Sequence, residues 1–447
     1  MSIPRKRVLV VTYYWPPSGG SGVQRTLKFC KYLREWGWEP VVLTVGERWA
    51  AWPDRDPGLE ADVPDGTRVI RTRSWDPYAA YARFLGVQRN DAVGVGFMAR
   101  DRVPGVRERL ARWVRANVFI PDARVGWALF ALVAAVRLHR TAPVEAVFTS
   151  GPPHSAHFVG RGMKHLFGLP WLADLRDAWP DMSYMAELPM GPAAQDLDRL
   201  LCTHTLRAAS VRVTVSRDVA GWMAGRTHLP YIVVPNGFDP EDIARAQPVA
   251  MPGFSLVHTG NLGASRNLSP LWHLFQVDPE LFEDIRIVLV GNVDRAVRDD
   301  IDTCGIGDRV LERAYVPHEE AIAFMKGASL LLLPINRVAQ AAGIVTGKIY
   351  EYVASGRPVL GLGEPGGEAD RVLRASGAGR VLAWDDIEGI GSYLRSHVEA
   401  WRRGAPVAGA DPARAAPWSR RIQTGEIASL LDNLTLPAGA QHPIRTS

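Results

Sequence analysis

Short apolar or β-branched runs recur along the first half of the chain and predict buried strands. Segments long enough to form helices separate them. The predicted strands are Val8–Val11, Val41–Thr44, Ala146–Ser150, Trp171–Asp174 and Val211–Val215. Such alternation of strands and helices is typical of a parallel sheet that helices cover on both faces.

The same rhythm restarts in the second half. After Pro235–Pro240 the chain is polar and proline-containing as far as Pro252, which is linker-like. Further strands are predicted at Ser255–His258, Ile287–Val290, Leu330–Leu333 and Val359–Leu362, and a strand-like run precedes Tyr315. Near the end we expect a loop at Arg403–Pro417, a helix at Ile422–Leu434 and a loose tail to Ser447. The pattern therefore predicts two successive α/β halves.

Composition is compatible with this organisation. At roughly 150 residues per domain, 447 residues allow two or three domains. Hydrophobic residues make up 47% and charged residues 22%, which is ordinary globular usage and excludes a disordered or fibrous chain. The net charge of +5 is small for this length, so charge alone gives no argument for nucleic acid binding. Cys30, Cys202 and Cys304 lie far apart, which suggests neither a disulfide framework nor a zinc site and fits a reducing cytoplasm.

No membrane-spanning segment is predicted. The apolar run at Val8 is too short for a signal peptide, and the uncharged stretch Val125–Val136 is shorter than the roughly 20 residues that cross a bilayer. The segment Arg100–Ile120 is different, because apolar residues at helical spacing share it with arginines on the other faces. This pattern favours a helix packed on its own domain, and peripheral contact with the inner face of a membrane is the open alternative.

A glycine-rich turn follows the first predicted strand. Gly19, Gly20, Ser21 and Gly22 precede a helix predicted over Thr26–Trp36. Such glycines let backbone N–H groups approach a phosphate or another anion at the helix start, although a connection without a ligand is the alternative. The turn departs from G-x-G-x-x-G, and no acidic residue ends the second strand, which disfavours a dinucleotide-dependent dehydrogenase.

Two polar groups follow later strands of the first half, where open α/β sheets place their sites. His154 and His157 stand three residues apart without an evident third metal ligand, so we interpret His154 as a polar site residue and His157 as a helix-face or core residue. Asp174 and Asp177 flank Arg176, which is compatible with an ion pair that fixes the loop or with a catalytic or acceptor-binding role. The D-x-D pairs Asp54/Asp56 and Asp196/Asp198 are interpreted as solvated carboxylates rather than metal ligands.

The second half repeats the logic of a phosphate-binding turn. Gly260 and Asn261 follow its first strand, and Arg266 is close behind. Further on, Thr346 and Gly347 precede a helix that contains Lys348 and Glu351. If Thr346 or Gly347 caps this helix, its free N–H groups face a diphosphate, Lys348 adds positive charge, and Glu351 can accept hydrogen bonds from ribose hydroxyls. The similarity to a P-loop is superficial, because the spacing differs.

In their order and spacing these motifs resemble the family 4 glycosyltransferases of GT-B architecture, over nearly the whole chain. The residues that carry the resemblance are Gly19–Gly22, Pro235–Asp239, Gly260 with Arg266, Gly291 and Thr346–Pro358. The resemblance implies an α/β fold of two Rossmann-like domains facing a cleft. It implies an acceptor-side domain at 1–245, a nucleotide-sugar donor domain at 246–415, a helix at 416–436 that returns to the first domain, and a tail at 437–447.

The same resemblance implies sugar transfer from a nucleotide-diphosphate donor to a glycan, lipid-linked or small-molecule acceptor, with retention of configuration and without a cofactor or metal. Arg266, Lys348, Thr346 and Gly347 would bind the diphosphate. Glu351 would hold the ribose, and Tyr315–His318, including Val316, would border the base. Gly260, Asn261 and Gly291 complete the implied donor site. His154 would lie beside the reacting sugar, and the turn around Gly20 with Asp174, Arg176 and Asp177 would meet the acceptor or a phosphate.

One position departs from the family. Gly343 stands eight residues before Glu351, where the family usually has an acid that contacts sugar hydroxyls. The backbone N–H groups of Ile344 and Val345 could substitute, or the donor could differ. A sugar-nucleotide epimerase or hydrolase on the same fold, or a non-catalytic nucleotide-sugar-binding protein, is therefore the alternative to a transferase.

Overall fold

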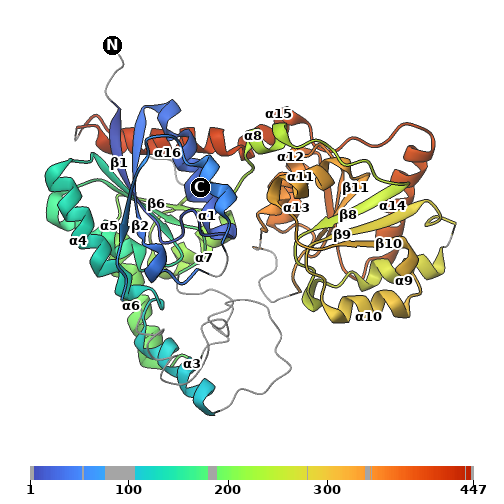
Figure 1. Cartoon of the computed structure of the whole chain (residues 1–447), viewed down its shortest axis with the longest axis horizontal. Coiled ribbons are helices and arrows are strands. Elements are labelled where there is room, and N and C mark those ends of the chain that lie inside the picture. The colour runs from blue at the N-terminus through green and yellow to red at the C-terminus, as the bar shows by residue number, and fades with distance from the viewer. Residues whose placement is uncertain are drawn as a thin grey trace. The chain divides into compact units, whose positions relative to one another are not determined.

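The computed structural model describes residues 5–52, 55–75, 106–179, 189–278, 280–337, 343, 345–437 and 439–443. These residues form two compact units, one within Met1–Pro235 together with Gln423–Ser447 and one within Asn236–Ile422 (Figure 1). Each unit is built around its own parallel β-sheet. The predicted fold class, two Rossmann-like α/β domains, is confirmed.

The sheet of the first unit has seven strands among the described residues, in the order β3-β2-β1-β4-β5-β6-β7. All neighbouring strands are parallel. The strand order reverses between β1 and β4, which is where open α/β sheets form a crevice at the carboxyl ends of their strands. The strands are β1 Lys6–Val11, β2 Trp38–Val45, β3 Arg68–Thr72, β4 Ala146–Gly151, β5 Trp171–Leu175, β6 Val211–Thr214 and β7 Ile232–Val233.

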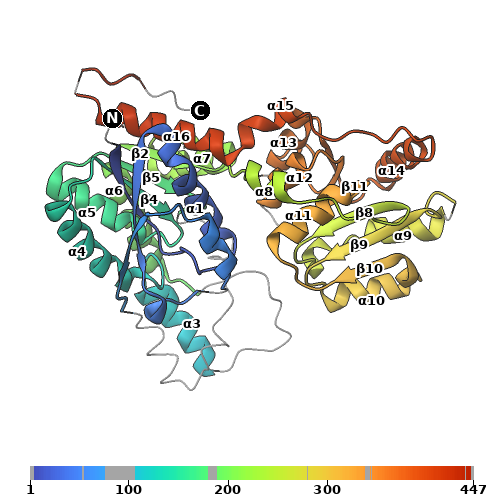
Figure 2. The ribbon, with the colours of Figure 1, turned by 45° about the horizontal axis from the view of Figure 1, so that its top comes forward.

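Helices cover both faces of this sheet because successive side chains of a strand point to opposite faces. On one face, Val8 and Val10 pack with residues of α1 (Ser21–Leu33) and α16 (Arg420–Thr435). On the other face, Leu9 and Val11 share a core with four helices, some of which Figure 2 shows on the side of the sheet away from α1. These helices are α4 Val125–Thr141, α5 Ala156–Phe167, α6 Pro192–Ala208 and α7 Arg217–Thr227.

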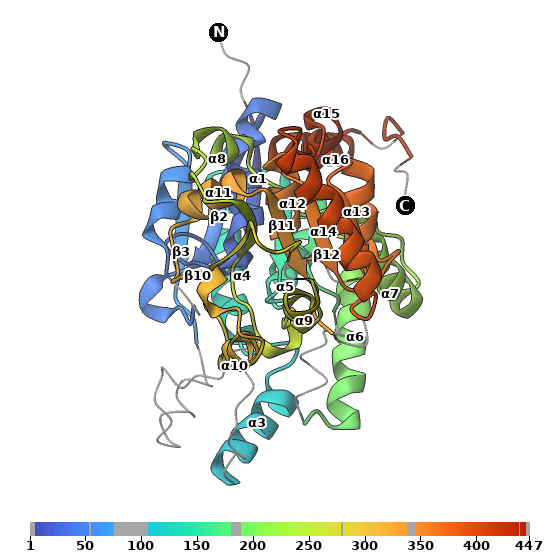
Figure 3. The ribbon, with the colours of Figure 1, turned by 90° about the vertical axis from the view of Figure 1, so that its right-hand side faces the viewer.

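A further helix, α3 (Val106–Val118), lies next to α6 (Figures 1 and 3). The amide of Asn117 links α3 to the start of α6, because its Nδ2 donates to Pro189 O at 2.8 Å and its Oδ1 accepts from Gly191 N at 2.7 Å. On its outer side, Leu110 and Trp113 are 51% and 50% exposed. The helix is therefore attached to the first unit while keeping an apolar surface in solvent.

The sheet of the second unit has six described strands in the order β10-β9-β8-β11-β12-β13, all parallel. Buried residues of α9, α10 and α14 form a core on one face, and those of α11, α12 and α13 form a core on the other. The strands are β8 Phe254–Thr259, β9 Ile285–Val290, β10 Val310–Arg313, β11 Leu330–Pro334, β12 Val359–Leu362 and β13 Gly379–Leu382. The helices are α8 Pro240–Arg245, α9 Ser269–Val277, α10 Arg295–Thr303, α11 His318–Gly327, α12 Lys348–Ala354, α13 Glu368–Ser376, α14 Ile387–Arg402 and α15 Pro412–Ala415.

All nine strands predicted by residue range are present, and β10 is the strand-like run before Tyr315. Three local predictions are wrong. The helix expected at Thr26 begins at Ser21, so Gly22 belongs to its first turn. The linker expected to Pro252 contains α8, which starts because Asp239 accepts a hydrogen bond from Glu241 N and Pro240 occupies the first turn. The loop expected at Arg403–Pro417 contains α15.

Helices long and apolar enough to cross a bilayer are absent from the part of the chain that the structure describes.

Candidate functional site

The two glycine turns of the second unit pack against each other at the carboxyl ends of β8 and β9. Gly260 and Gly291 have φ angles of +96° and +126°, which residues with a side chain rarely adopt. A Cβ atom on Gly291 would lie 2.7 Å from the carbonyl oxygen of Gly260. Both positions therefore require glycine.

Lys348, the first residue of α12, places its ammonium group against this turn. Its Nζ donates a hydrogen bond to Thr259 O, and a Cβ atom on Gly260 would lie 2.1 Å from the same nitrogen. Burial and the positive charge of Arg266 lower the pKa of Lys348 to about 8, while Glu351 opposes the shift. The site thus holds a lysine whose positive charge is disfavoured in the absence of an anion.

Arg266 is the second cation of the site. It ends the 3₁₀ turn Ala264–Arg266 that follows Gly260, and burial lowers its pKa. Its Nε is buried and has no hydrogen-bond partner among the residues described. Within the described ranges, neither Arg266 nor Lys348 forms an ion pair with an acidic side chain. Two neighbouring cations without a carboxylate form a site suited to an anion.

Glu351 has a partner that the sequence analysis did not assign to it. The carboxylate Oε1 lies 2.7 Å from Nε2 of His318, at the start of α11, and Nδ1 of the same imidazole lies 3.9 Å from Asp242 Oδ2. The family resemblance implies that Tyr315–His318 borders a base, and the structure adds that the side chain of His318 contacts Glu351. The one sequence feature that pointed to His318 was its place directly after a proline, between a predicted strand and a helix. No spacing rule connects this position to a residue on another helix, so its contact with Glu351 could not be predicted.

The remaining residues predicted for the donor site differ in how far they are exposed to solvent. Gly347 is the N-cap of α12 without a side-chain cap, and the Oγ1 of Thr346 is buried without a partner among the described residues. Asn261 is exposed, and Val316 is partly buried against the core below. Gly343 is buried, and a glycine supplies no carboxylate at this position.

In the first unit, the glycine turn is held by an arginine from another strand. Gly19 is buried, Gly20 has a φ of +82° directly before α1, and Ser21 is the first helical residue. Arg176 Nη1 donates to the carbonyl oxygen of Gly22 at 2.6 Å, in the first turn of that helix. A Cβ atom on Gly22 would lie 3.3 Å from the Tyr14 ring. This turn is therefore tied to the end of β5.

The ion pair that fixes this region differs from the predicted one. Asp174 pairs with Arg25 of α1 at 2.8 Å, and both side chains are at most 1% exposed. Asp174 also accepts a hydrogen bond from Ser150 Oγ at 2.8 Å. Of the two alternatives left open by the sequence, an ion pair of Arg176 with Asp174 is not formed, because the guanidinium of Arg176 donates to backbone carbonyls of Gly22, Gly151 and Pro152.

Asp177 takes no part in these hydrogen bonds. Its side chain is partly buried, and burial raises its pKa although the nearby charge of Arg176 lowers it. No hydrogen bond to its carboxylate occurs among the residues described.

His154 and His157 are both buried beside β4. His157 Nδ1 lies 2.7 Å from Thr149 Oγ1, and burial lowers the pKa of His157 to about 4, which agrees with its interpretation as a core residue. Both ring nitrogens of His154 lack a partner among the described residues, and burial lowers its pKa well below the usual value. A Cβ atom on Gly151 would lie 3.1 Å from His154 Nδ1 and 2.7 Å from His157 Nε2. Burial therefore disfavours the charged form of both imidazoles, which lie at the end of β4.

The expectation that the carboxylates of the two D-x-D pairs are solvated holds for some of these residues and not for others. Asp196 is exposed and pairs with Arg199, and Asp56 accepts a hydrogen bond from Gly58 N at the start of a 3₁₀ turn. Asp198 is not solvated: it is 1% exposed, and its Oδ1 accepts a hydrogen bond from Trp179 Nε1 at 2.8 Å. Asp54 and residues 100–105 of the basic segment lie outside the described residues.

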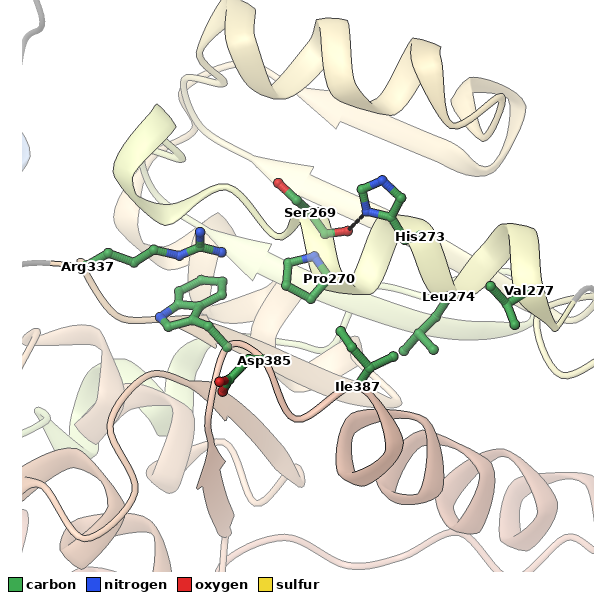
Figure 4. Close-up of a pocket in the computed structure, with 9 residues that line it drawn as sticks. Ser269, Pro270, His273, Leu274, Val277, Arg337, Asp385 and Ile387 are labelled. Carbon is green, nitrogen blue, oxygen red and sulfur yellow. Dashed lines mark hydrogen bonds between the residues drawn. The ribbon is translucent and has the colours of Figure 1, made fainter.

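A separate groove of about 500 Å³ lies in the second unit between α9 and the start of α14 (Figure 4). Arg337, which follows β11, reaches into it and lies 4.1 Å from the centre of the Trp384 ring. The backbone N–H of Arg337 donates to Ser265 O at 3.3 Å, next to Arg266. The groove is otherwise lined by Ser269, Pro270, His273, Leu274, Val277, Asp385 and Ile387.

Comparisons with known proteins show the fold. No protein-family model matches the sequence, and no curated protein is detectably related to it in sequence. HepE from Anabaena, solved in complex with UDP, is 13% identical with a TM-score of 0.60 over 96% of this chain and 99% of that one. A glycosyltransferase from Rickettsia africae is 11% identical with a TM-score of 0.59 over 97% and 99% of the two chains. Sucrose-phosphate synthase from Thermosynechococcus elongatus is 13% identical with a TM-score of 0.54 over 96% of each chain. The chain therefore shares the GT-B fold.

Proposed function

We propose that this protein is a glycosyltransferase that moves a sugar from a nucleotide-diphosphate donor to an acceptor hydroxyl. The observation that carries the proposal is the pair Arg266 and Lys348, two partly buried cations without an acidic partner among the described residues, set on a glycine turn at the carboxyl end of a parallel sheet. The fold adds support, because HepE, which shares it, was solved with UDP and with UDP-glucose.

In this reaction the acceptor oxygen forms a bond to the anomeric carbon while the bond from that carbon to the diphosphate oxygen breaks. The electron pair stays on the diphosphate, which also takes up the acceptor proton. Arg266 and Lys348 stabilise the negative charge that develops there, which is the main catalytic contribution we assign to the chain. Thr346 and Gly347 assist at the diphosphate, and Glu351, oriented by His318, binds the ribose.

From the first unit, His154 is assigned a place beside the reacting sugar and Asp177 a place at the acceptor. We further propose that transfer proceeds with retention of anomeric configuration and needs no metal. The expected product keeps the anomeric configuration of the donor in its proton NMR spectrum, and EDTA leaves the rate unchanged. An inverted product or loss of rate in EDTA would refute these two points separately.

The central test is a thermal-shift screen of UDP, GDP and ADP sugars followed by turnover assays. A donor that binds the folded state raises the melting temperature with its occupancy. We expect one nucleotide class to raise it in the wild-type protein and not in Lys348→Ala. Rapid formation of an epimer or free sugar without acceptor would instead indicate an epimerase or hydrolase. Tight donor binding with no turnover across acceptors would indicate a binding protein, for which Gly343 is the motivating feature.

For the acceptor side, we further propose that α3 contacts an anionic membrane surface. The described part of the predicted segment exposes Leu110 and Trp113 beside the exposed Arg109, the combination of apolar and basic groups that suits a lipid interface. We expect the protein to sediment with vesicles containing anionic lipid and Trp113→Ala to reduce this. The control is Leu129→Ala, because Leu129 of α4 is 67% exposed and lies on another helix. Absence of vesicle binding at any salt concentration would exclude the contact.

A further inference from the structure

His154 poses a problem of orientation. Its side chain is 5% exposed, yet neither ring nitrogen has a hydrogen-bond partner among the described residues. A buried imidazole without hydrogen bonds is free to rotate unless packing fixes its plane, and it loses hydration energy that a ligand would have to restore. The groups that pack on this ring therefore decide where its nitrogens point.

The main packing partner is Trp179. The two rings are stacked with centroids 5.1 Å apart and an interplanar angle of 7°. His157 is stacked less closely, at 5.9 Å and 27°. The backbone next to His154 is fixed independently, because Asp122 accepts hydrogen bonds from both the N–H and the hydroxyl of Ser155 at 2.8 and 2.9 Å. The backbone is thus anchored by Asp122 and the ring plane by Trp179.

Trp179 in turn is held at several points. Its indole Nε1 donates to Asp198 Oδ1 at 2.8 Å, its backbone N–H lies 3.2 Å from Met223 Sδ, and its carbonyl accepts from Cys202 Sγ at 3.2 Å. Phe158 packs against the ring edge at 6.2 Å. A surface held in this way can impose its plane on a histidine that has no other restraint.

Using the carboxylate of Asp198 to accept the indole N–H of Trp179 carries a desolvation cost. It is almost fully buried, and no cation pairs with it among the residues described. Burial and the negative charge of Asp122 raise its pKa to about 6, while the indole hydrogen bond lowers it. A neutral acceptor would satisfy the indole N–H without this cost.

We propose that Trp179 and Asp198 are a pair of positioning residues that hold the imidazole of His154 in the orientation in which it meets the ligand. The functional part of this inference rests on the proposed function, which places His154 beside the reacting sugar. The structural part concerns the ligand-free protein and stands independently of any activity.

The structural part is tested by NMR of histidine-labelled protein, with His154→Gln used to assign the signal. Stacking on an indole shifts the ring proton of His154 upfield through the ring current. We expect this shift to be lost in Trp179→Leu and Asp198→Leu and to be kept in Asp198→Asn, whose amide oxygen still accepts the indole N–H. The control is Asp196→Leu, two residues away on the same helix with a side chain 74% exposed. An unchanged chemical shift of His154 in Asp198→Leu would refute the proposal that Trp179 and Asp198 together position His154.

The functional part is tested by kinetics of variants whose melting temperature shows that they are folded. We expect Asp198→Leu to lower kcat about tenfold with an unchanged KM for the donor, and Asp198→Asn to recover most of kcat. A purely structural role would change the melting temperature without this split. Wild-type kcat in Asp198→Leu, together with a displaced His154 signal, would refute the functional part. Absence of turnover by the wild-type protein would refute the proposed function and leave the NMR result to decide the pair.

Discussion

The glycine turns of the two units look alike in sequence but differ in how their cations are used. In the first unit, Arg25 is buried in an ion pair with Asp174, and Arg176 donates to three backbone carbonyls. In the second unit, Arg266 and Lys348 have no acidic partner among the described residues, and Arg266 contributes to the low pKa of Lys348. The first set of cations stabilises the fold, and the second is poised for an anion.

The comparison shows that a glycine turn with arginine nearby does not identify an anion site by itself. What decides is whether the protein already supplies the negative partner. In the first unit, carbonyl groups and a carboxylate satisfy the guanidinium groups, and burial disfavours the charged form of the two histidines. In the second unit no such partner occurs among the described residues, and our proposed function assigns that place to the donor diphosphate.

The largest effect is expected when the first unit loses its buried pair. Asp174→Ala leaves the Arg25 guanidinium buried without its carboxylate, which costs about 3–5 kcal/mol of unfolding free energy. Urea denaturation of the full chain measures this. Asp196→Ala, which removes only an exposed ion pair, should change the free energy by less than about 1 kcal/mol. Equal stability of the two variants would contradict a structural role for Arg25.

The matching experiment in the second unit should give the opposite pattern. In our proposed function Arg266 stabilises the leaving diphosphate, so in Arg266→Met kcat/KM should fall about 10²–10³-fold, whereas the unfolding free energy should not fall. Steady-state kinetics and denaturation of one preparation give both numbers. Arg295→Met is the control, because its side chain is 91% exposed on α10. If Arg266→Met lowered the unfolding free energy without lowering kcat/KM, the cations of the two units would not differ in role as described.

Glu351→Ala should have a somewhat smaller effect. The carboxylate is expected to bind ribose hydroxyls, and a hydrogen bond to a charged group contributes about 1.5–3 kcal/mol. We expect kcat/KM to fall accordingly and His318→Gln to cause part of this loss, because His318 orients the carboxylate at 2.7 Å. Unchanged kcat/KM with an identified donor would remove Glu351 from the site.

The pH dependence of donor binding sharpens the comparison further. The pKa of Lys348 is lowered from 10.5 to about 8, so the ligand-free site loses this positive charge as the pH rises above 8. Donor affinity should fall by up to about tenfold per pH unit there, as measured by calorimetry. Lys348→Arg keeps its charge and should flatten the curve. A flat curve for the wild-type protein would contradict the role of Lys348.

Stability should respond to the same titration with the opposite sign. Because the pKa of Lys348 is about 8 in the folded chain and near 10.5 in the unfolded chain, the unfolded state binds more protons between these values. The contribution of this residue to the unfolding free energy therefore rises with pH in that window. Denaturation of the wild type and Lys348→Met at pH 8 and 10 tests it, since the variant lacks the rise.

Sequence reasoning found the central strands because these are apolar on both faces, as in Leu330–Pro334, which is buried throughout. It missed β3, β7 and β13, which are edge strands or very short. In Arg68–Thr72 two of the five residues are exposed and the others only partly buried, so no apolar run marks it. An edge strand depends on its single neighbour for hydrogen bonds, and a local pattern does not contain that information.

The candidate site shows the same limit. The sequence placed Gly260, Arg266, Lys348 and Glu351 on the correct turns and helix, because glycine, helix-start and charge signals are local. The pairing of Arg25 with Asp174 joins residues 149 positions apart, and the choice between Asp174 and a carbonyl as partner follows from tertiary packing. For the same reason Asp198, which composition suggested to be solvated, is buried under Trp179.

The packing of α16 on β1 has a consequence for biosynthesis. Val8 and Val10 share a core with Ile427 and Leu431, so part of the cover of β1 comes from a helix that is synthesised more than 400 residues later. At about 5–20 residues per second, a ribosome needs tens of seconds to supply that helix. Until then one face of β1 lacks part of its apolar cover.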